Sequence, residues 1–321
     1  MEKPILYVVV PCYNEELVLP EASKRLKEKL TELIKNHKIH QNSKILFIND
    51  GSKDTTWELI KNLCCSDGLF CGISLSKNKG HQNALLAGLL KAKDLADIAI
   101  SIDADLQDDV NAIDDMLKAY KQGYEIVYGV RSKRKTDSIF KRKTAQGFYK
   151  LLKMLGVDIV YNHADYRLMS QRALKTLAEF REVNLFLRGI VPMLGYKTTT
   201  VEYERHNRFA GETKYPLKKM LSFAIEGITS LSIRPIRLIS MVGLLAFLGS
   251  LVMLVFILVD YFGGGTATGW ASIVFSIWAI GGLQLLAIGI IGEYIGKIYL
   301  EAKARPRYII EEEVFGDEDN I

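Results

Sequence analysis

Short apolar runs alternate with longer amphipathic stretches through roughly the first 130 residues of the chain. The apolar runs predict β-strands at 5–10, 44–49, 71–75, 98–102 and 125–131. Helical periodicity lies between them, at about 16–37, 54–65, 82–93 and 108–122. Regular alternation of strand and helix predicts right-handed crossovers and an α/β fold. Its sheet is expected to be mainly parallel and covered by helices on both faces.

Two segments near the other end of the chain are apolar on every side. Leu238–Val259 and Trp270–Ile291 each run for 22 residues without a charge. At 1.5 Å per residue, each is long enough to cross a hydrocarbon core of about 30 Å. A buried helix of a soluble protein would normally show a polar face, and neither segment does. The pattern predicts two transmembrane helices.

The orientation of these spans follows from the flanking positive charges. Arg234 and Arg237 precede the first span and Lys297 follows the second, whereas the connecting loop DYFGGGTATG has no Lys or Arg. The N-terminal run ILYVVV is too short for a signal peptide. We therefore expect a multi-pass protein of the cytoplasmic (inner) membrane. Its N-terminal α/β domain and both termini would lie in the cytoplasm.

Composition adds local charge. The chain has 321 residues, a formal net charge of +5 and a mean hydropathy of +0.08. Residues 131–153 carry nine Lys or Arg against one acid, interleaved with aromatic side chains, and 214–233 is a second such stretch. In a chain held in a bilayer, basic amphipathic helices on anionic headgroups are the simplest interpretation. A solvated helix face and a nucleic-acid patch remain open alternatives.

Neither the cysteines nor the acidic C-terminal segment is expected to form a functional site. The four cysteines form no C-x-x-C pair, so a disulfide framework or a structural zinc site is not expected. The acidic segment Glu311–Asp319 is expected to be disordered and is given no chemistry.

Polar clusters follow three of the predicted strands. The first strand ends in PCYNE, the second in NDGS and the fourth in DADLQD. Any one of these could be a turn followed by a helix cap. Because the carboxyl ends of parallel strands meet at one edge of an open sheet, three together predict a ligand site at that edge.

The acidic cluster suggests which ligand the site holds. A helix N-terminus accounts for Asp108 and Asp109, but Asp103 and Asp105 continue the strand alternation and point to one side. The chain has no G-x-G-x-x-G after the first strand, no phosphate-binding P-loop and no G-x-S-x-G elbow. Acids bind a phosphate only through a cation. With Gln107, the two aspartates offer hard oxygen ligands suited to Mg²⁺ or Mn²⁺, which bridges carboxylates to a diphosphate.

Seven motifs in order now give a resemblance: VVVPCYNE, INDGSKDTT, LSKNKGHQNA, DADLQDD, YGVRSKR, ADYRLMS and RFAGETKY. The sequence resembles the membrane-bound polyprenyl-phosphate glycosyltransferases of family 2, which include bactoprenol glucosyltransferases and dolichol-phosphate mannose synthase. The resemblance covers about residues 5–235, and the two spans match the bacterial branch. It implies a GT-A (Rossmann-like) catalytic domain at 1–213 and a membrane-surface amphipathic region at 214–236. A transmembrane hairpin at 237–299 and an acidic cytosolic tail at 300–321 would follow.

The resemblance also implies roles for individual residues. Asp165 matches the acidic residue usually assigned as catalytic, although pairing with Arg167 or capping a helix would explain it too. Tyr166 and Thr213 stand where Phe and Ser are frequent, and both keep the chemistry. His81 is expected to begin a helix and is given no role. The nucleotide-sugar pocket would be formed by Pro11, Tyr13, Glu15, Asp50 (reading the base), Asp103 and Ala104, the metal site by Asp105, Gln107 and Asp103, and the phosphate-binding groups by Arg131, Arg205, Arg208 and Lys214.

The reaction implied is transfer of a sugar from a nucleotide diphosphate to a polyprenyl phosphate, with inversion and with Mg²⁺ or Mn²⁺. The bacterial branch favours glucose from UDP-glucose. GDP-mannose, a UDP-N-acetylhexosamine and a modified pentose donor remain open. The acceptor is a phosphate that is largely ionised near neutral pH, so Asp165 is expected mainly to orient groups. A homo-oligomer is expected from the relatives and from the glycine-rich second span, and no nucleic-acid partner is expected.

Two other functions compete. A processive polysaccharide synthase would carry a Q-x-x-R-W motif, and no tryptophan here (Trp57, Trp270, Trp278) lies in one. A non-catalytic membrane protein that binds nucleotides or ions, such as part of a transporter, is the other alternative, and a transport path would need ionisable groups along the spans. Asp260 and Glu293 lie only near the span ends, which argues against a transport path.

Overall fold

The computed structural model of the chain describes residues 3–132, 163–183, 185–204, 232, 234–263 and 269–315. The chain divides into two compact units. The sheet unit consists of Met1–Tyr149, Asp158–Pro216 and Arg305–Ile321, and the helical unit of Lys150–Val157 and Leu217–Ala304.

The sheet unit alternates strand and helix through its first half, as the apolar pattern predicts. Its elements are β1 (Leu6–Cys12), α1 (Leu19–Lys35), β2 (Lys44–Asn49), α2 (Thr56–Ser66), β3 (Phe70–Leu75), α3 (His81–Leu95), β4 (Ile98–Ser101), α4 (Ala112–Lys121), β5 (Ile126–Arg131), β6 (His163–Ser170), α6 (Gln171–Glu179), α7 (Leu187–Met193), β7 (Thr198–Tyr203) and β8 (Ile310–Phe315).

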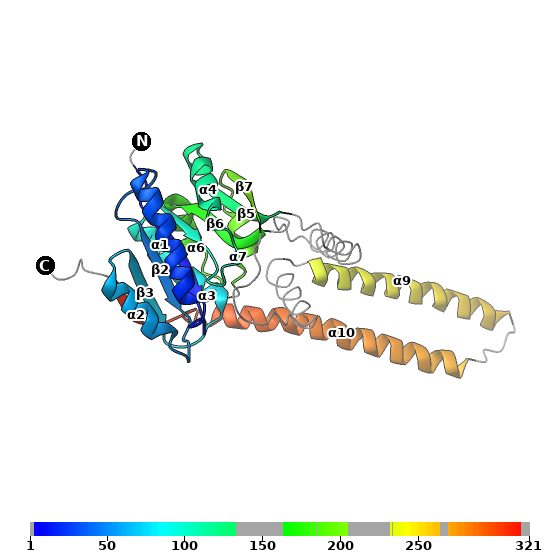
Figure 1. Cartoon of the computed structure of the whole chain (residues 1–321). Helices are drawn as coiled ribbons and strands as arrows, with labels where there is room; N and C mark the ends of the chain where they lie inside the picture. Colours follow the sequence, from blue (N-terminus) through cyan, green and yellow to red (C-terminus); the bar gives the residue numbers. More distant parts are fainter. Residues whose placement is uncertain are drawn as a thin grey trace. The chain divides into compact units, whose positions relative to one another are not determined.

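The strands form one sheet in the order β7-β5-β6-β4-β1-β2-β3-β8. Figure 1 shows β2 and β3 toward one side of this sheet and β5, β6 and β7 toward the other. Strands β4, β1, β2 and β3 are mutually parallel, and β5 is parallel to β7. Strand β6 runs antiparallel between β4 and β5, and β8 runs antiparallel along β3. The mainly parallel α/β architecture expected from the sequence is confirmed.

Two apolar clusters cover the two faces of the sheet. Leu6 and Val8 of β1 pack with residues of α1, α2 and α4, whereas Tyr7 and Val9 pack with residues of α3, α6 and α7. This follows from the strand period of two, which sends successive side chains to opposite faces. Helix α3 lies especially close to the sheet, because a Cβ at Gly88 would come within 2.3 Å of the Val9 side chain. The result is a three-layer unit with buried central strands.

Three strands depart from the sequence-based expectation. Strands β6 and β7 were not predicted, and the disorder expected from Glu311 to Asp319 is wrong as far as Phe315, because this segment forms β8. The rest of that tail lies outside the described residues. Helix α4 begins at Ala112 rather than near 108. Asp109 there accepts a hydrogen bond from the Asn111 amide at 2.9 Å and so stabilises a turn before the helix.

The helical unit contains α9 (Arg234–Phe262) and α10 (Trp270–Ala302). Within the described residues, one segment, Ala279–Ala302, is long and apolar enough to cross a bilayer, with a hydropathy of 1.5. It overlaps the predicted second span and extends beyond it. The first span, the hairpin and the orientation stay predictions, and most of the two basic stretches lies outside the described residues.

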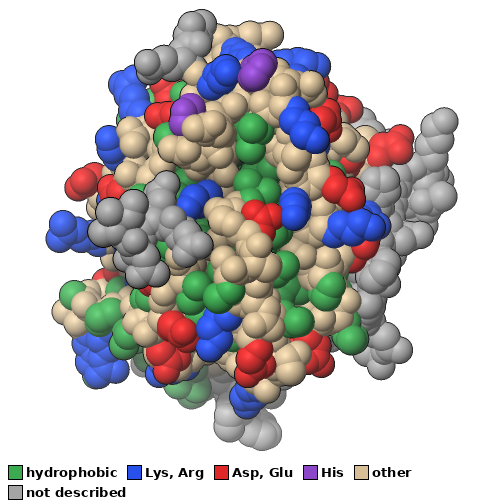
Figure 2. Space-filling view, turned by 60° about the vertical axis from the view of Figure 1, so that its left-hand side comes forward, with side chains coloured by type: hydrophobic (Ala, Val, Ile, Leu, Met, Phe, Trp, Pro, Cys, Tyr) green, Lys and Arg blue, Asp and Glu red, His purple; other side chains and the backbone are tan. Residues whose placement is uncertain are grey.

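Charged side chains of both signs are spread over one face of the molecule. On the face drawn in Figure 2, Lys and Arg are interspersed with Asp and Glu, and apolar side chains occupy small areas between them. A mixed surface of this kind is typical of a face exposed to water.

Candidate active site

Polar loops follow the carboxyl ends of three adjacent parallel strands. Cys12, the last residue of β1, pairs with Asn49, the last residue of β2, and Ser101 at the end of β4 pairs with Val9 of β1. The loops after β1, β2 and β4 therefore leave the sheet at the same edge, as the sequence pattern predicts.

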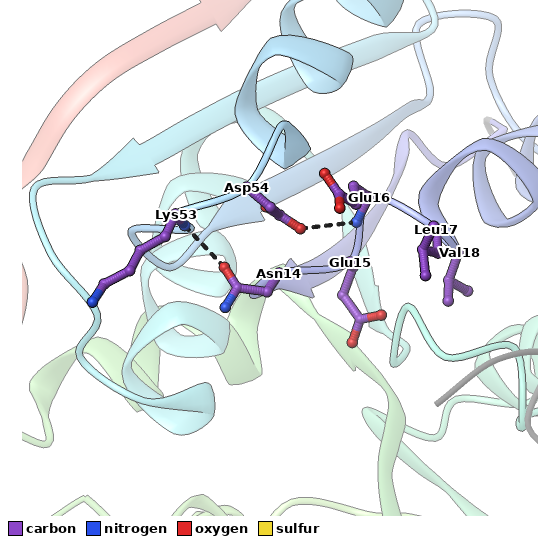
Figure 3. A pocket seen from close by; sticks show the side chains of 7 residues that line it. All are labelled: Asn14, Glu15, Glu16, Leu17, Val18, Lys53 and Asp54. Atoms are coloured by element: carbon purple, nitrogen blue, oxygen red, sulfur yellow. Dashed lines mark hydrogen bonds between the residues drawn. The ribbon is translucent and has the colours of Figure 1, made fainter. Parts of the chain in front are cut away.

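The loops after β1 and β2 are locked together by hydrogen bonds. The amide of Lys53 donates to Oδ1 of Asn14 at 2.9 Å, and the amide of Glu16 donates to Oδ2 of Asp54 at 3.3 Å (Figure 3). Asn14 has a φ of 53°, a left-handed conformation that asparagine tolerates well. A pocket of about 370 Å³ lies here, within the size range of small-molecule sites. It is lined by Asn14, Glu15, Glu16, Leu17, Val18, Lys53 and Asp54.

Asp50 is buried, and its two oxygens bind the loop after β3. Oδ1 accepts from the Lys79 amide at 2.7 Å and Oδ2 accepts from the Gly80 amide at 2.9 Å. Burial raises the pKa of Asp50, opposed by these two backbone hydrogen bonds. Gly51 has a φ of +62°, and a Cβ there would lie 2.6 Å from backbone atoms of Lys77 and Asn78. The loop at 77–80 therefore packs directly on Asp50 and Gly51.

In the acidic loop after β4, Asp108 and Asp103 lie in different surroundings. Asp108 is buried and accepts hydrogen bonds from the Tyr203 hydroxyl at 2.5 Å and from Nη2 of Arg131 at 3.4 Å. Asp103 is partly buried, and burial, with the nearby charges of Asp165, Asp108 and Asp105, raises its pKa to about 6 against the opposing effect of His81. Such crowding of carboxylates is relieved when a cation binds. The donor set therefore fits a divalent ion.

The described residues supply only part of a metal coordination sphere. No group of three or more His, Cys, Asp or Glu in the described ranges is arranged to hold a metal by itself. Oδ2 of Asp108 is buried and has no hydrogen-bond partner among the described residues. A divalent ion at this edge would therefore complete its coordination with ligand oxygens or water, which is usual for Mg²⁺.

Asp165 of β6 lies at the centre of a cluster of cationic side chains. Its Oδ1 accepts from Nη2 of the buried Arg167 at 2.6 Å, and its Oδ2 accepts from Nη2 of Arg188 at 3.0 Å. Nε2 of His81 lies 3.5 Å from Oδ2 of Asp165 and also 3.5 Å from Oδ1 of Asp103. His81 thus joins the acidic loop to the Asp165 cluster.

The cluster fixes the ionisation of Asp165. Burial alone would raise the pKa of Asp165, but the hydrogen bond from His81 and the charges of Arg188 and Arg167 outweigh it and hold the pKa well below its usual range. For His81, burial lowers the pKa, and Asp165 and Asp103 together reverse this into a net rise. Asp165 is therefore a fixed anion, with little tendency to accept a proton.

Comparison with known proteins places this site in a family. The model for "Glycosyl transferase family 2" matches residues 7–178, more than half of the chain. The chain belongs to glycosyltransferase family 2. The mainly parallel sheet described above is thus the sheet of a glycosyltransferase.

Relatives match over nearly the full length. The uncharacterized glycosyltransferase YkoT of Bacillus subtilis is 53% identical over 98% of this chain and 94% of its own length. The bactoprenol glucosyl transferase of Shigella phage SfV is 40% identical over 95% of this chain and 98% of its own. Among solved structures, mannosyl-3-phosphoglycerate synthase of Rubrobacter xylanophilus is similar at a TM-score of 0.48 and 15% identity, over 73% of this chain and 74% of that one.

The structure brings most of the sequence-predicted site residues to the same edge of the glycosyltransferase sheet. Tyr13 is exposed and Glu15 lines the pocket after β1. Pro11 and Ala104 differ from the expectation, because their side chains are buried: Pro11 pairs within the sheet with Ile48, and Ala104 belongs to the apolar core. Arg205, Arg208 and Lys214 lie outside the described residues.

Two further residues of the site were not identified from the sequence. His81 lies in LSKNKGHQNA, which marked the position without assigning a role, and Arg188 carries no local signal at all. Both can be recognised as site residues only in the folded structure, where α3 and α7 place them beside Asp165 of β6.

Proposed function

We propose that this glycosyltransferase moves glucose from UDP-glucose to a polyprenyl phosphate at the cytoplasmic face of the membrane, with inversion at the anomeric carbon. One observation carries the proposal. The bactoprenol glucosyl transferases of Shigella phages are 40% identical over 94–95% of this chain, including the long apolar helices. Similarity of that extent covers both the sugar-transfer site and the region expected to contact a lipid.

The donor site would use the acidic edge of the sheet. Asp103 and Asp105, with Gln107, would hold Mg²⁺ or Mn²⁺ beside the diphosphate of the donor. When bound, such an ion neutralises the charge that develops on the leaving diphosphate. The pocket after β1 and Asp50 lie at the same edge, so the nucleotide is proposed to bind there, with Asp50 reading the base and Asp103 contacting the ribose or the metal.

Asp165 would act by orientation rather than by removing a proton. The attacking phosphate oxygen of the acceptor is largely ionised near neutral pH, so a strong base is not needed. Asp165 itself is held ionised by Arg167 and Arg188. Its role in this account is to fix the Arg188 guanidinium and His81 beside the reacting atoms. Arg131, Arg205, Arg208 and Lys214 are proposed to bind the donor and acceptor phosphates.

The helical unit would hold the chain at the lipid acceptor. Segment Ala279–Ala302 is apolar, and its side chains Leu285 and Ile288 are 72% and 63% exposed. Exposure of such side chains suits lipid rather than water. A hairpin with both ends in the cytoplasm, contacts with anionic lipid and a homo-oligomer belong to the same proposal.

A panel assay tests the proposal. Full-length protein in nanodiscs is incubated with undecaprenyl phosphate, Mg²⁺ or Mn²⁺, and UDP-glucose, GDP-mannose or UDP-N-acetylglucosamine in parallel, and the lipid is analysed by mass spectrometry. We expect a hexosyl phospholipid with UDP-glucose and divalent cation, and none with EDTA. A different preferred donor would overturn the choice of glucose. No modified lipid with any donor would overturn the reaction itself.

A further inference from the structure

The chain returns to the sheet unit after its last apolar helix and adds an edge strand. Strand β8 pairs antiparallel with β3, from Cys71 opposite Phe315 to Leu75 opposite Ile310. The pairing extends beyond the end of β3, because the amide of Ser76 donates to the carbonyl of Ile309 at 3.0 Å. Strand β8 thus covers the sheet edge and reaches the first residue of the loop that follows β3.

Side chains anchor β8 on both faces of the sheet. Glu312 accepts from Nε1 of Trp57 on α2 at 2.7 Å, and Glu313 lies 2.5 Å from Nζ of Lys91 on α3. Val314 packs against the cluster that contains α1 and α2, and Phe315 against the cluster that contains α3. A strand held on both faces has a defined register, since a slip by one residue would exchange the two sets of contacts.

The loop that β8 reaches belongs to the active site. Its Lys79 and Gly80 amides bind Asp50, and the next residue, His81, lies between Asp103 and Asp165. The exit of β3 is therefore held from one side by β8 and from the other by Asp50. Loosening either contact would allow the loop and the first turn of α3 to move relative to the acidic edge.

We propose that β8 is a positioning element of the donor site: it fixes the end of β3 so that the 77–80 loop stays on Asp50 and His81 stays between Asp103 and Asp165. That this site binds the nucleotide-sugar donor rests on the proposed function. Along the chain, only residues 303–309 separate α10 from β8. The strand that follows the apolar helix is therefore part of the sheet unit, which carries the candidate active site.

A merely protective role makes a different prediction. Edge strands are often covered simply to prevent intermolecular pairing. If β8 did only that, weakening its anchors would lower stability or solubility and leave the substrate constants of the folded enzyme unchanged. A positioning role instead raises KM for the nucleotide sugar and leaves KM for the polyprenyl phosphate unchanged.

Full-length variants separate the two. Glu312→Gln with Glu313→Gln removes both charged anchors, and Val314→Ala with Phe315→Ala removes the apolar ones. Glu311→Gln is the matched control, because Glu311 is exposed and lies at the irregularity in the β3–β8 pairing. We expect each double variant to raise the donor KM about three- to tenfold, with acceptor KM unchanged. Hydrogen exchange of peptides covering 76–83 should accelerate while β1 and β4 stay protected.

Several results would overturn the inference. Donor KM and exchange at 76–83 equal to those of the Glu311→Gln control would do so, as would equal changes in the donor and acceptor constants. If the wild type transfers no sugar, the proposed function fails, and the comparison is made on the Kd for UDP with Mn²⁺. A Kd unchanged in both double variants, or an absence of UDP binding by the wild type, then overturns the inference as well.

Discussion

Nη2 of Arg167 donates to Oδ1 of Asp165 over 2.6 Å, and the Arg167 side chain is completely buried. A guanidinium out of contact with water needs a fixed anion beside it. Asp165 meets that need and at the same time binds Arg188, which is partly exposed. The carboxylate thus links a buried cation to a cation at the surface of the site, which is an arrangement for orientation rather than for proton transfer.

Asp165→Asn should lower kcat at least about a hundredfold, because Arg188 and His81 lose the charge that orients them. It should also destabilise the fold by about 3 kcal/mol, since Arg167 is left as a buried unpaired cation. Steady-state kinetics and thermal unfolding measure the two effects. Adding Arg167→Met should recover much of the stability and none of the activity. Wild-type turnover in Asp165→Asn would remove the residue from the mechanism.

The pH dependence of metal activation should follow Asp103. Its pKa in the metal-free fold is about 6, so a proton competes with the cation below that pH and not above it. The apparent activation constant for Mn²⁺ should therefore increase as pH falls, by up to about tenfold per pH unit. Asp165 should contribute no acid limb, because its pKa is held well below the usual range. An activation constant that is the same from about pH 5 to 8 would contradict the assignment.

Asp103→Asn should stabilise the metal-free protein while abolishing metal-dependent transfer. Burial and the neighbouring carboxylates penalise the ionised Asp103, and the amide removes that penalty. We expect the Tm measured in EDTA to increase by a few degrees, of the order of 4 °C. An unchanged Tm together with full activity would show that the ionised Asp103 does not destabilise the metal-free fold and that Asp103 is not a metal ligand.

A second buried ion pair lies away from the site and tests the packing of α1 on α4. Nζ of Lys29, a side chain only 5% exposed, lies 2.5 Å from Oδ2 of Asp114, and Nζ of Lys38 lies 2.5 Å from Oδ1 of the same residue. Asp114→Asn should destabilise the fold by about 1–2 kcal/mol, because Lys29 keeps, among the described residues, only Glu32, at 3.0 Å, as an anionic partner. Asp115→Asn, which removes an exposed carboxylate that pairs with Lys118, is the control and should change little.

The same pair sets a pH dependence of stability. Burial would raise the pKa of Asp114, but the hydrogen bonds that it accepts from Lys29 and Lys38 outweigh this and hold its pKa below the ordinary value of an aspartate. A carboxyl group with a depressed folded-state pKa stabilises the fold above its unfolded pKa and loses that contribution as pH falls through the folded one. The Tm difference between wild type and Asp114→Asn should therefore be constant near neutral pH and shrink below about pH 4. A difference that grows on acidification would contradict the pairing.

The sequence predicts the central strands well because a strand buried on both faces is a continuous apolar run. The sequence does not predict strand β6, because HADYRLMS contains the charged residues Asp165 and Arg167 and so lacks a continuous apolar run. Only in the folded structure do these two residues pair and allow a charged strand to be buried. Strand β8 was missed because IEEEVF has the composition of a disordered tail. Its carboxylates are matched by Trp57 and Lys91, more than 200 residues earlier in the chain.

The site likewise contains residues that the sequence predicts and residues that only the structure identifies. Asp103 and Asp105 are recognisable because they follow a strand directly, and motif order marks Asp165. His81 and Arg188 come from two other elements, and only the tertiary structure brings them to Asp165. Side chains that act together across α3, β6 and α7 leave no local pattern in the sequence.

The most direct test of the account is the rate of glucosyl transfer from UDP-glucose to undecaprenyl phosphate, measured for the wild type and Asp105→Asn over a range of Mn²⁺ concentrations. We predict transfer by the wild type that saturates with Mn²⁺ and is lost in EDTA, and transfer by Asp105→Asn that stays near background at every concentration. Equal rates for the two proteins, or wild-type transfer that persists in EDTA, would contradict the claim that the acidic edge of the sheet binds the donor through a metal.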